Sequence, residues 1–95
     1  MSEDKLARAL GSKVRRDIIR YLVKSTKVSV HGIAKILNLS EPSASKHLKK
    51  LYDLGILESN DKGRERFYSL RIAEMKQLIK DYDTVVKKLG GDYND

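Results

Sequence analysis

The segment from residue 40 to residue 70 constrains the fold most, because its pattern changes from helical to strand-like within one short stretch. Ser40 can cap a helix, and Pro42 lies in what would be the first turn, where a missing backbone N–H is tolerated. Gly55 ends the helical pattern, and a charged hairpin with a glycine in its turn follows over residues 56–70. The sequence therefore predicts a helix over residues 40–54 followed directly by a two-stranded wing.

The rest of the chain has helical periodicity, interrupted by one short strand. Taken together, the elements predict a mainly α fold with a small β-wing, a winged helix-turn-helix in the order α-α-(β)-α-α-β-β-α. The chain is expected to form a single domain over residues 1–90, with a flexible acidic tail at 91–95. The other expected elements are helices at 3–10, after Ser12, at 31–37 and at 71–89, a strand at 28–30, and wing strands at 56–59 and 66–70.

Charge is distributed unevenly along the chain. The net charge is +7, and residues 11–50 alone carry ten Lys or Arg against two acids, which gives +8. Such a cluster favours a polyanionic partner. The chain has no cysteine, and no apolar run reaches the roughly 18 residues of a membrane span. We therefore expect a cytoplasmic protein with double-stranded DNA as partner and no membrane partner.

The predicted helix over residues 40–54 has two distinct faces. Ala44, Leu48 and Leu51 fall on one side at helical spacing, and polar or basic residues fall on the other. Small residues near the helix start would allow close approach to a major groove, and lysines further along could reach phosphates or guanine edges. Wing cations could contact the adjacent backbone or minor groove. The expected DNA-binding residues are Ser40, Glu41, Ser43, Ser45, Lys46, Lys49, Lys50, Lys62, Arg64 and Arg66.

Three stretches of the chain carry a family resemblance. Residues 9–22 (A-L-G-S-K-V-R-R-D-I-I-R-Y-L), 38–57 (N-L-S-E-P-S-A-S-K-H-L-K-K-L-Y-D-L-G-I-L) and 63–70 (G-R-E-R-F-Y-S-L) resemble the opening, the recognition helix and the wing of ArsR-family repressors. The resemblance covers about residues 6–89. It implies a winged helix-turn-helix regulator of transcription.

One departure from the family pattern bears on metal sensing. Metal-sensing members carry E-L-C-x-C-D-L where this chain has K-V-S-V-H-G-I, so Ser29 and His31 replace the cysteines and Gly32 replaces the acid. The last helix has no histidine, and a transition-metal site needs several nitrogen or sulfur ligands. We therefore expect no metal site and no cofactor, and we interpret His31 and His47 as structural residues.

The last predicted helix carries an apolar stripe with alternating spacings of three and four residues from 72 to 89. Such a heptad pattern is typical of a helix that packs against another helix. The family resemblance implies that the first and last helices form a homodimer. The candidate interface residues are Leu6, Leu10, Ile79, Tyr82, Val86 and Leu89.

These observations favour a homodimeric, sequence-specific transcriptional regulator, with repression as its expected mode. A lysine-dominated reading face without Arg, Asn or Gln leaves a low-specificity architectural DNA-binding protein as the alternative. A winged-helix module that binds protein rather than DNA is a third hypothesis. No catalytic motif is present: the chain lacks cysteine, a phosphate-binding loop and a G-x-S-x-G sequence. It is therefore not expected to be an enzyme.

Overall fold

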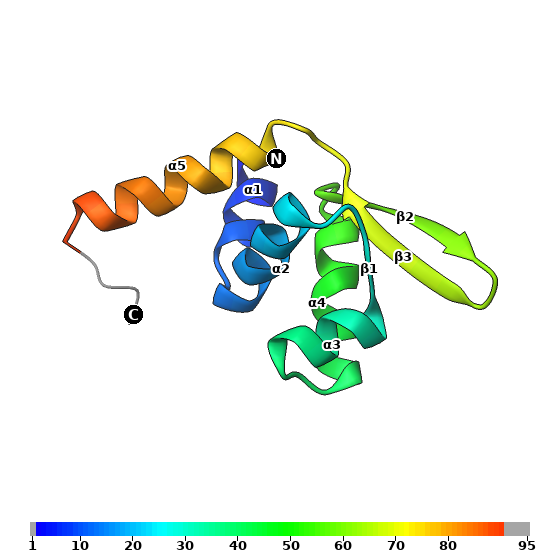
Figure 1. The fold of residues 1–95 in the computed structure, drawn as a ribbon. Helices are drawn as coiled ribbons and strands as arrows, with labels where there is room; N and C mark the ends of the chain where they lie inside the picture. Colours follow the sequence, from blue (N-terminus) through cyan, green and yellow to red (C-terminus); the bar gives the residue numbers. More distant parts are fainter. Residues whose placement is uncertain (1, 91–95) are drawn as a thin grey trace.

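Five helices and a three-stranded antiparallel sheet make up the part of the chain that the computed structural model describes, residues 2–90 (Figure 1). Their order confirms the predicted winged helix-turn-helix. The expected tail at 91–95 lies outside the described residues. The elements are α1 (Ser2–Leu10), α2 (Lys13–Lys24), β1 (Val28–Ser29), α3 (Val30–Leu37), α4 (Glu41–Asp53), β2 (Leu57–Lys62), β3 (Glu65–Leu70) and α5 (Met75–Lys88).

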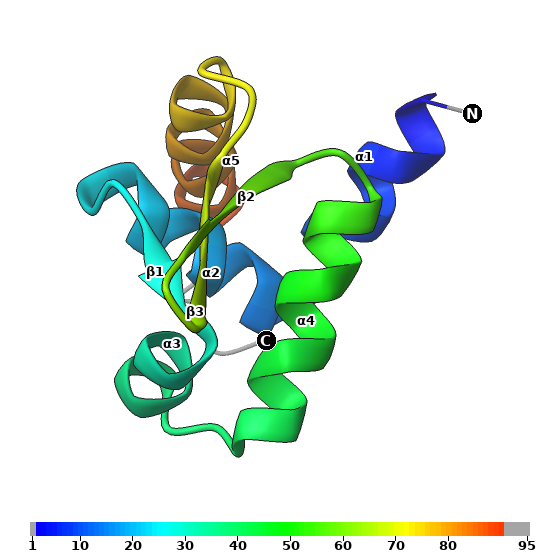
Figure 2. The same ribbon diagram turned by 90° about the vertical axis from the view of Figure 1, so that its right-hand side faces the viewer.

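The apolar residues at helical spacing in α2, α3 and α4 meet in one core. Ile18, Ile33, Leu48 and Leu51 are fully buried there, and Leu57 reaches the same core from the inner face of the sheet. Burying side chains of this size is the main favourable contribution to folding. Viewed from the wing side, α4 runs along one edge of the molecule with α3 beside its first turns (Figure 2). The core therefore fixes the orientation of α4.

Side-chain caps mark the helix ends that the sequence predicted. Ser12 Oγ accepts a hydrogen bond from the Arg15 N–H at 3.3 Å, and Ser40 Oγ accepts one from the Ser43 N–H at 3.2 Å. Asn38 adopts the left-handed conformation (φ 55°, ψ 51°) after α3. Because each cap satisfies a backbone group that the helix itself cannot, the turn between α3 and α4 is well defined.

The wing is longer than the sequence suggested. Its strands extend to Lys62 and Glu65, which pair across the hairpin, so that Gly63 and Arg64 alone form the turn. Gly63 has a φ of +64°, which a residue with a side chain rarely adopts. The sequence-based boundaries at 59 and 66 were wrong because polar residues in an exposed hairpin carry no apolar pattern, although their backbones still pair. The strand β1 pairs with the other edge of β3, giving the order β1-β3-β2.

The last helix begins at Met75, four residues later than predicted. The Arg71 N–H donates to the Ile56 carbonyl at 3.0 Å, and Arg71 Nε donates to the Gly55 carbonyl at 2.7 Å. These bonds keep the chain beside the start of the wing. Ile72, which the heptad pattern included, therefore lies before the helix rather than in it.

An ion pair and a cation–π contact join α5 to α2. Arg20 Nη2 lies 2.7 Å from Asp83 on α5, and Arg20 Nη1 lies 2.8 Å from Asp17 on its own helix. The hydrogen bond to Asp83 raises the pKa of Arg20 above its ordinary value. Burial alone would raise the pKa of Asp17, but hydrogen bonds from Lys13 and Arg20 outweigh it and lower that pKa. The guanidinium of Arg16 also lies over the Tyr82 ring, 5.5 Å from its centroid. The two helices are thus joined while α5 extends away from the wing (Figure 1).

Candidate nucleic-acid interface

The two faces of α4 are separated as its sequence predicted. Ala44, Leu48 and Leu51 are completely buried. The polar and basic positions face solvent, with Ser43 half-buried beneath them. The exposed positions on this helix and its cap are Ser40, Glu41, Ser45, Lys46, Lys49 and Lys50. A helix with one apolar and one cationic face, followed by a hairpin, has the shape and charge needed to enter a DNA groove.

The three lysines of α4 differ in their partners. Lys49 Nζ lies 3.1 Å from Asp53 one turn later. Within residues 2–90, neither Lys46 nor Lys50 takes part in an ion pair. These two lysines can therefore meet a phosphate without first losing a partner, whereas Lys49 must leave its carboxylate.

A carboxylate lies at the start of α4. Glu41 is the first residue of the helix, and its Oε2 lies 3.0 Å from His31 Nδ1 on α3. A negative charge is favourable at a helix N-terminus but repels an approaching phosphate. His31 is therefore a hydrogen-bonding partner of this carboxylate. His31 was interpreted from the sequence as a structural residue, but the sequence could not identify its partner.

The wing brings three cations to its tip. Lys62, Arg64 and Arg66 are all exposed. Arg66 Nε lies 2.9 Å from Asp61 on the neighbouring strand, and this hydrogen bond lowers the pKa of Asp61 and raises that of Arg66. The Asp61 carboxylate thus binds the Arg66 guanidinium at the place where a DNA phosphate would bind.

Replacing Asp61 with asparagine should strengthen binding to duplex DNA severalfold, because it frees Arg66 and removes a negative charge from the wing. The dependence of log affinity on log salt should also become steeper by about 0.9, the increment for one additional phosphate contact. Fluorescence anisotropy over a range of salt concentrations measures both quantities. Glu3→Gln is the matched control, because it removes the same charge from an exposed position of α1. Equal affinities for Asp61→Asn and the wild type would exclude Arg66 from the interface.

Several arginines of residues 11–50 form bonds within the protein, so their charges are not freely available to DNA. Arg15 donates to the Arg8 carbonyl at 2.6 and 3.0 Å, and Arg16 donates to the Leu10 carbonyl at 2.7 Å. These bonds satisfy carbonyls at the end of α1. Arg20 is held by carboxylates, as described above. The +8 charge of residues 11–50 therefore overstates the charge available to DNA, because the sequence does not show which arginines follow a helix end closely enough to cap it.

His47 of α4 was interpreted from the sequence as a structural residue. It is half-buried, and its Nδ1 is enclosed without a hydrogen-bond partner among the described residues. Burial, followed by the positive charges of Arg15 and Lys46, lowers the pKa of His47 below its ordinary value of 6.5. The imidazole is therefore held neutral within the fold.

We expect the domain to lose stability as the pH falls below about 6.5, because the unfolded chain then takes up a proton at His47 more readily than the folded chain does. Above that pH both states are neutral at this position, and the contribution of His47 does not change with pH. Chemical denaturation at a series of pH values measures the effect. His47→Gln should flatten this part of the profile, and a variant with the wild-type profile would show that His47 is not its source.

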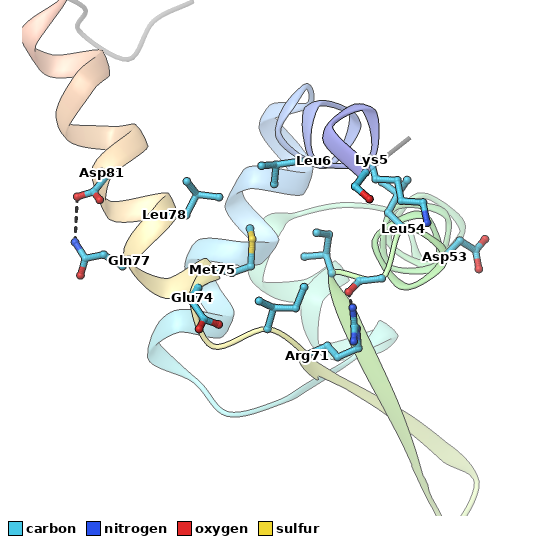
Figure 3. Close-up of a pocket in the computed structure, with 14 residues that line it drawn as sticks. Lys5, Leu6, Asp53, Leu54, Arg71, Glu74, Met75, Gln77, Leu78 and Asp81 are labelled. Atoms are coloured by element: carbon cyan, nitrogen blue, oxygen red, sulfur yellow. Dashed lines mark hydrogen bonds between the residues drawn. The ribbon is translucent and has the colours of Figure 1, made fainter.

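A second surface, apolar rather than basic, lies between α1 and α5. A groove of about 750 Å³ opens there, with Leu6, Leu54, Met75 and Leu78 among the side chains that line it (Figure 3). Lys5, Arg71, Glu74 and Asp81 also line the groove. Large apolar grooves on a small domain commonly mark a contact with another molecule.

The distal half of α5 carries further apolar side chains outside the core. The side chains of Val85 and Leu89 are 55% and 80% exposed, and Tyr82 and Val86 are half-buried. Leu6 and Leu10 of α1 are half-buried against the core. Ile79, in contrast, is only 2% exposed and packs within the chain's own core, which leaves little of its surface for a partner. The heptad pattern could not distinguish the two roles, because both place apolar residues at the same spacing.

Among residues 2–90, no three His, Asp or Glu side chains gather closely enough to hold a metal ion. Over the same range, no helix is long and apolar enough to cross a bilayer.

The sequence was compared with models of protein families. The sequence model of the bacterial regulatory protein arsR family matches residues 12–59, from the cap of α2 to the first wing strand. The chain belongs to the arsR family. Membership of this regulatory family agrees with the prediction that the chain is not an enzyme.

Relatives and solved structures extend the similarity beyond the matched segment. The chain is 33% identical over 79 residues to the "cadmium resistance transcriptional regulatory protein CadC homolog" of Staphylococcus aureus, covering 83% of this chain and 65% of that protein. It spans less than two thirds of the length of the curated relatives it matches.

Two solved structures show the same fold. The transcriptional repressor BigR from Xylella fastidiosa superposes with a TM-score of 0.77 at 27% identity, covering 86% of this chain and 83% of that one. A homodimeric winged helix-turn-helix DNA-binding domain from Mycobacterium bovis superposes with a TM-score of 0.83 at 19% identity, covering 99% of this chain and 88% of that one. These superpositions confirm the winged helix-turn-helix fold predicted from the sequence.

Proposed function

We propose that this arsR-family protein is a homodimeric, sequence-specific regulator that represses transcription by placing α4 in the major groove of DNA. The observation that carries this proposal is the position of Lys46 and Lys50, which are exposed and without ion-pair partners on the face of α4 opposite the core. The wing, with Lys62, Arg64 and Arg66, lies on the flanking backbone or in the minor groove.

The N-terminal half of α4 approaches the bases most closely. Ser40 and Ser43 lie at the positive end of the helix, where a phosphate is favoured. Ser45 is small enough to allow close contact with a base edge. Lys46 is placed to bond guanine, and Glu41 to accept from cytosine once it leaves His31. Lys49 and Lys50 contact phosphates further along the groove.

A second copy of the chain is the proposed occupant of the apolar surface between α1 and α5. Leu78 of α5 lines the groove, and exposed apolar side chains recur further along the same helix at Val85 and Leu89, as expected for a helix that packs against its own copy. A two-fold partner would place two recognition helices about 34 Å apart, the spacing of successive major grooves. The Mycobacterium bovis domain of the same fold is described as homodimeric. The proposed interface comprises Leu6, Leu10, Leu78, Tyr82, Val85, Val86 and Leu89.

Repression is the proposed mode because a homodimer on an operator can exclude other proteins, and the Xylella relative is described as a repressor. Ser29 and His31 occupy the positions that cysteines hold in metal-sensing members, so we propose that neither a metal nor a cofactor controls DNA binding here. A regulator must reach the chromosome, and the cytoplasm is its proposed location.

A low-specificity architectural role is the second candidate. The exposed face of α4 carries no Arg, Asn or Gln, the residues that discriminate best between bases. Such a protein would bind most sequences with similar affinity.

Selection of bound duplexes from a random library tests the proposal. A regulator that binds as a homodimer should enrich an inverted repeat with half-sites one helical turn apart. A flat sequence profile with retained DNA binding would favour the architectural role. Absence of any DNA binding at low salt would leave the winged-helix protein-binding module as the surviving hypothesis.

A further inference from the structure

The outer face of the sheet carries a second concave surface, separate from α4. Pairing across β2 and β3 sets Asn60 opposite Phe67 and Glu58 opposite Ser69, so these side chains share one face. The other face points into the core through Leu57 and other buried residues. The hollow on the outer face has a volume of about 370 Å³, and the side chains that line it include Lys27, Glu58, Asn60, Lys62, Phe67 and Lys76.

Three lysines converge on this hollow from three different segments. Lys27 lies in the connection before β1, Lys62 ends β2, and Lys76 lies in the first turn of α5. Within residues 2–90 none of the three forms an ion pair. One carboxylate, that of Glu58, shares the lining. The excess of positive charge therefore favours an anion.

The interior of the hollow suits the organic part of such an anion. Leu22, Phe67 and Leu70 provide apolar surface, and Lys27 Nζ lies 4.7 Å from the centroid of the Phe67 ring. The side chains of Asn60 and Ser69 make no hydrogen bonds within the described residues, so both are available to a ligand. Apolar surface with a few convergent polar groups, at this volume, is typical of small-molecule sites.

We propose that this hollow binds a small organic phosphate of the nucleotide class. The phosphate pairs with Lys27, Lys62 and Lys76, and a planar ring lies against Phe67. Lys27 and Lys76 lie outside the proposed DNA-binding residues, whereas Lys62 of the wing belongs to both sets. The proposal therefore does not depend on DNA binding by α4.

Calorimetric titration with adenosine monophosphate tests the site, with adenosine and inorganic phosphate as the two halves of the probe. The nucleotide should bind more tightly than either half. K27Q/K76Q should weaken nucleotide binding about tenfold, as expected for the loss of charge-assisted contacts. Glu58→Gln should strengthen it, because the repelling carboxylate is removed. K35Q/K80Q is the matched control: it removes two exposed lysines that do not line the hollow, and it should bind like the wild type.

Three results would overturn the proposal. The nucleotide could bind no better than its halves, or K35Q/K80Q could lose as much affinity as K27Q/K76Q. The third is a parallel loss of DNA affinity in K27Q/K76Q, which would assign the hollow to the DNA flank. K46A/K50A should retain nucleotide binding, so failure of the DNA-binding proposal and failure of this one are distinguishable.

Discussion

Replacing both Val86 and Leu89 with glutamate should produce a folded monomer that binds an inverted-repeat DNA at least about 100-fold more weakly than the wild type. Two linked half-site contacts gain about 10²- to 10⁴-fold over one, and the monomer loses that gain. The fold should survive because Leu89 is 80% exposed and Val86 is only half-buried, so neither belongs to the core. Sedimentation and light scattering measure the oligomeric state, and circular dichroism reports the fold.

Thr84→Glu provides the control for added charge on α5. Thr84 is exposed and lies on the opposite side of the helix from Tyr82 and Val86. This variant should remain dimeric and retain wild-type DNA affinity. A wild-type protein that is monomeric at tens of micromolar, with and without DNA, would remove both the dimer and the expectation of an inverted repeat.

The double variant K46A/K50A should bind duplex DNA much more weakly while keeping the thermal stability of the wild type. Both side chains are exposed and lack ion-pair partners within residues 2–90. If each lysine contacts one phosphate, the slope of log affinity against log salt should fall in magnitude by about 1.8 for each bound protomer. Anisotropy titrations beside thermal melts measure the two properties. Wild-type binding by K46A/K50A would show that α4 does not lie against DNA.

Leu48→Ala, on the same helix, should instead lower the stability of the domain. Leu48 is completely buried, so truncation leaves a cavity and should lower the free energy of unfolding by about 2–5 kcal/mol. DNA binding by this variant should then be lost through unfolding rather than through a missing contact. The comparison separates the core face of α4 from its reading face.

The reading helix could be predicted from the sequence because its determinants are local. Ser40, Pro42 and Gly55 mark its ends, and three apolar positions mark its buried side. Each of these signals acts within one or two turns and requires no knowledge of distant contacts. A local preference also accounts for the left-handed conformation of Asn38 at the end of α3, because asparagine adopts that conformation more readily than most residues.

Features set by distant contacts could not be predicted in this way. The late start of α5 depends on hydrogen bonds between Arg71 and residues 55–56. The burial of Ile79 depends on which side of α5 faces the core. Arg15 and Arg16 contributed to the charge argument, yet they cap α1, and Asp61 acquires its partner only when the hairpin pairs. In each case the residue type indicates which interactions a side chain can make, and the fold determines with which neighbour it makes them.

The most direct test of DNA recognition by α4 and the wing is the affinity of the wild-type protein for duplex DNA over a series of salt concentrations. We predict a linear fall of log affinity with log salt, with a magnitude of about 0.9 for each phosphate that the dimer neutralises. Lys46, Lys50, Lys62 and Arg64 on each of two protomers would give a slope of about −7. A slope near zero, or no binding at low salt, would contradict the assignment of these cations to a DNA interface.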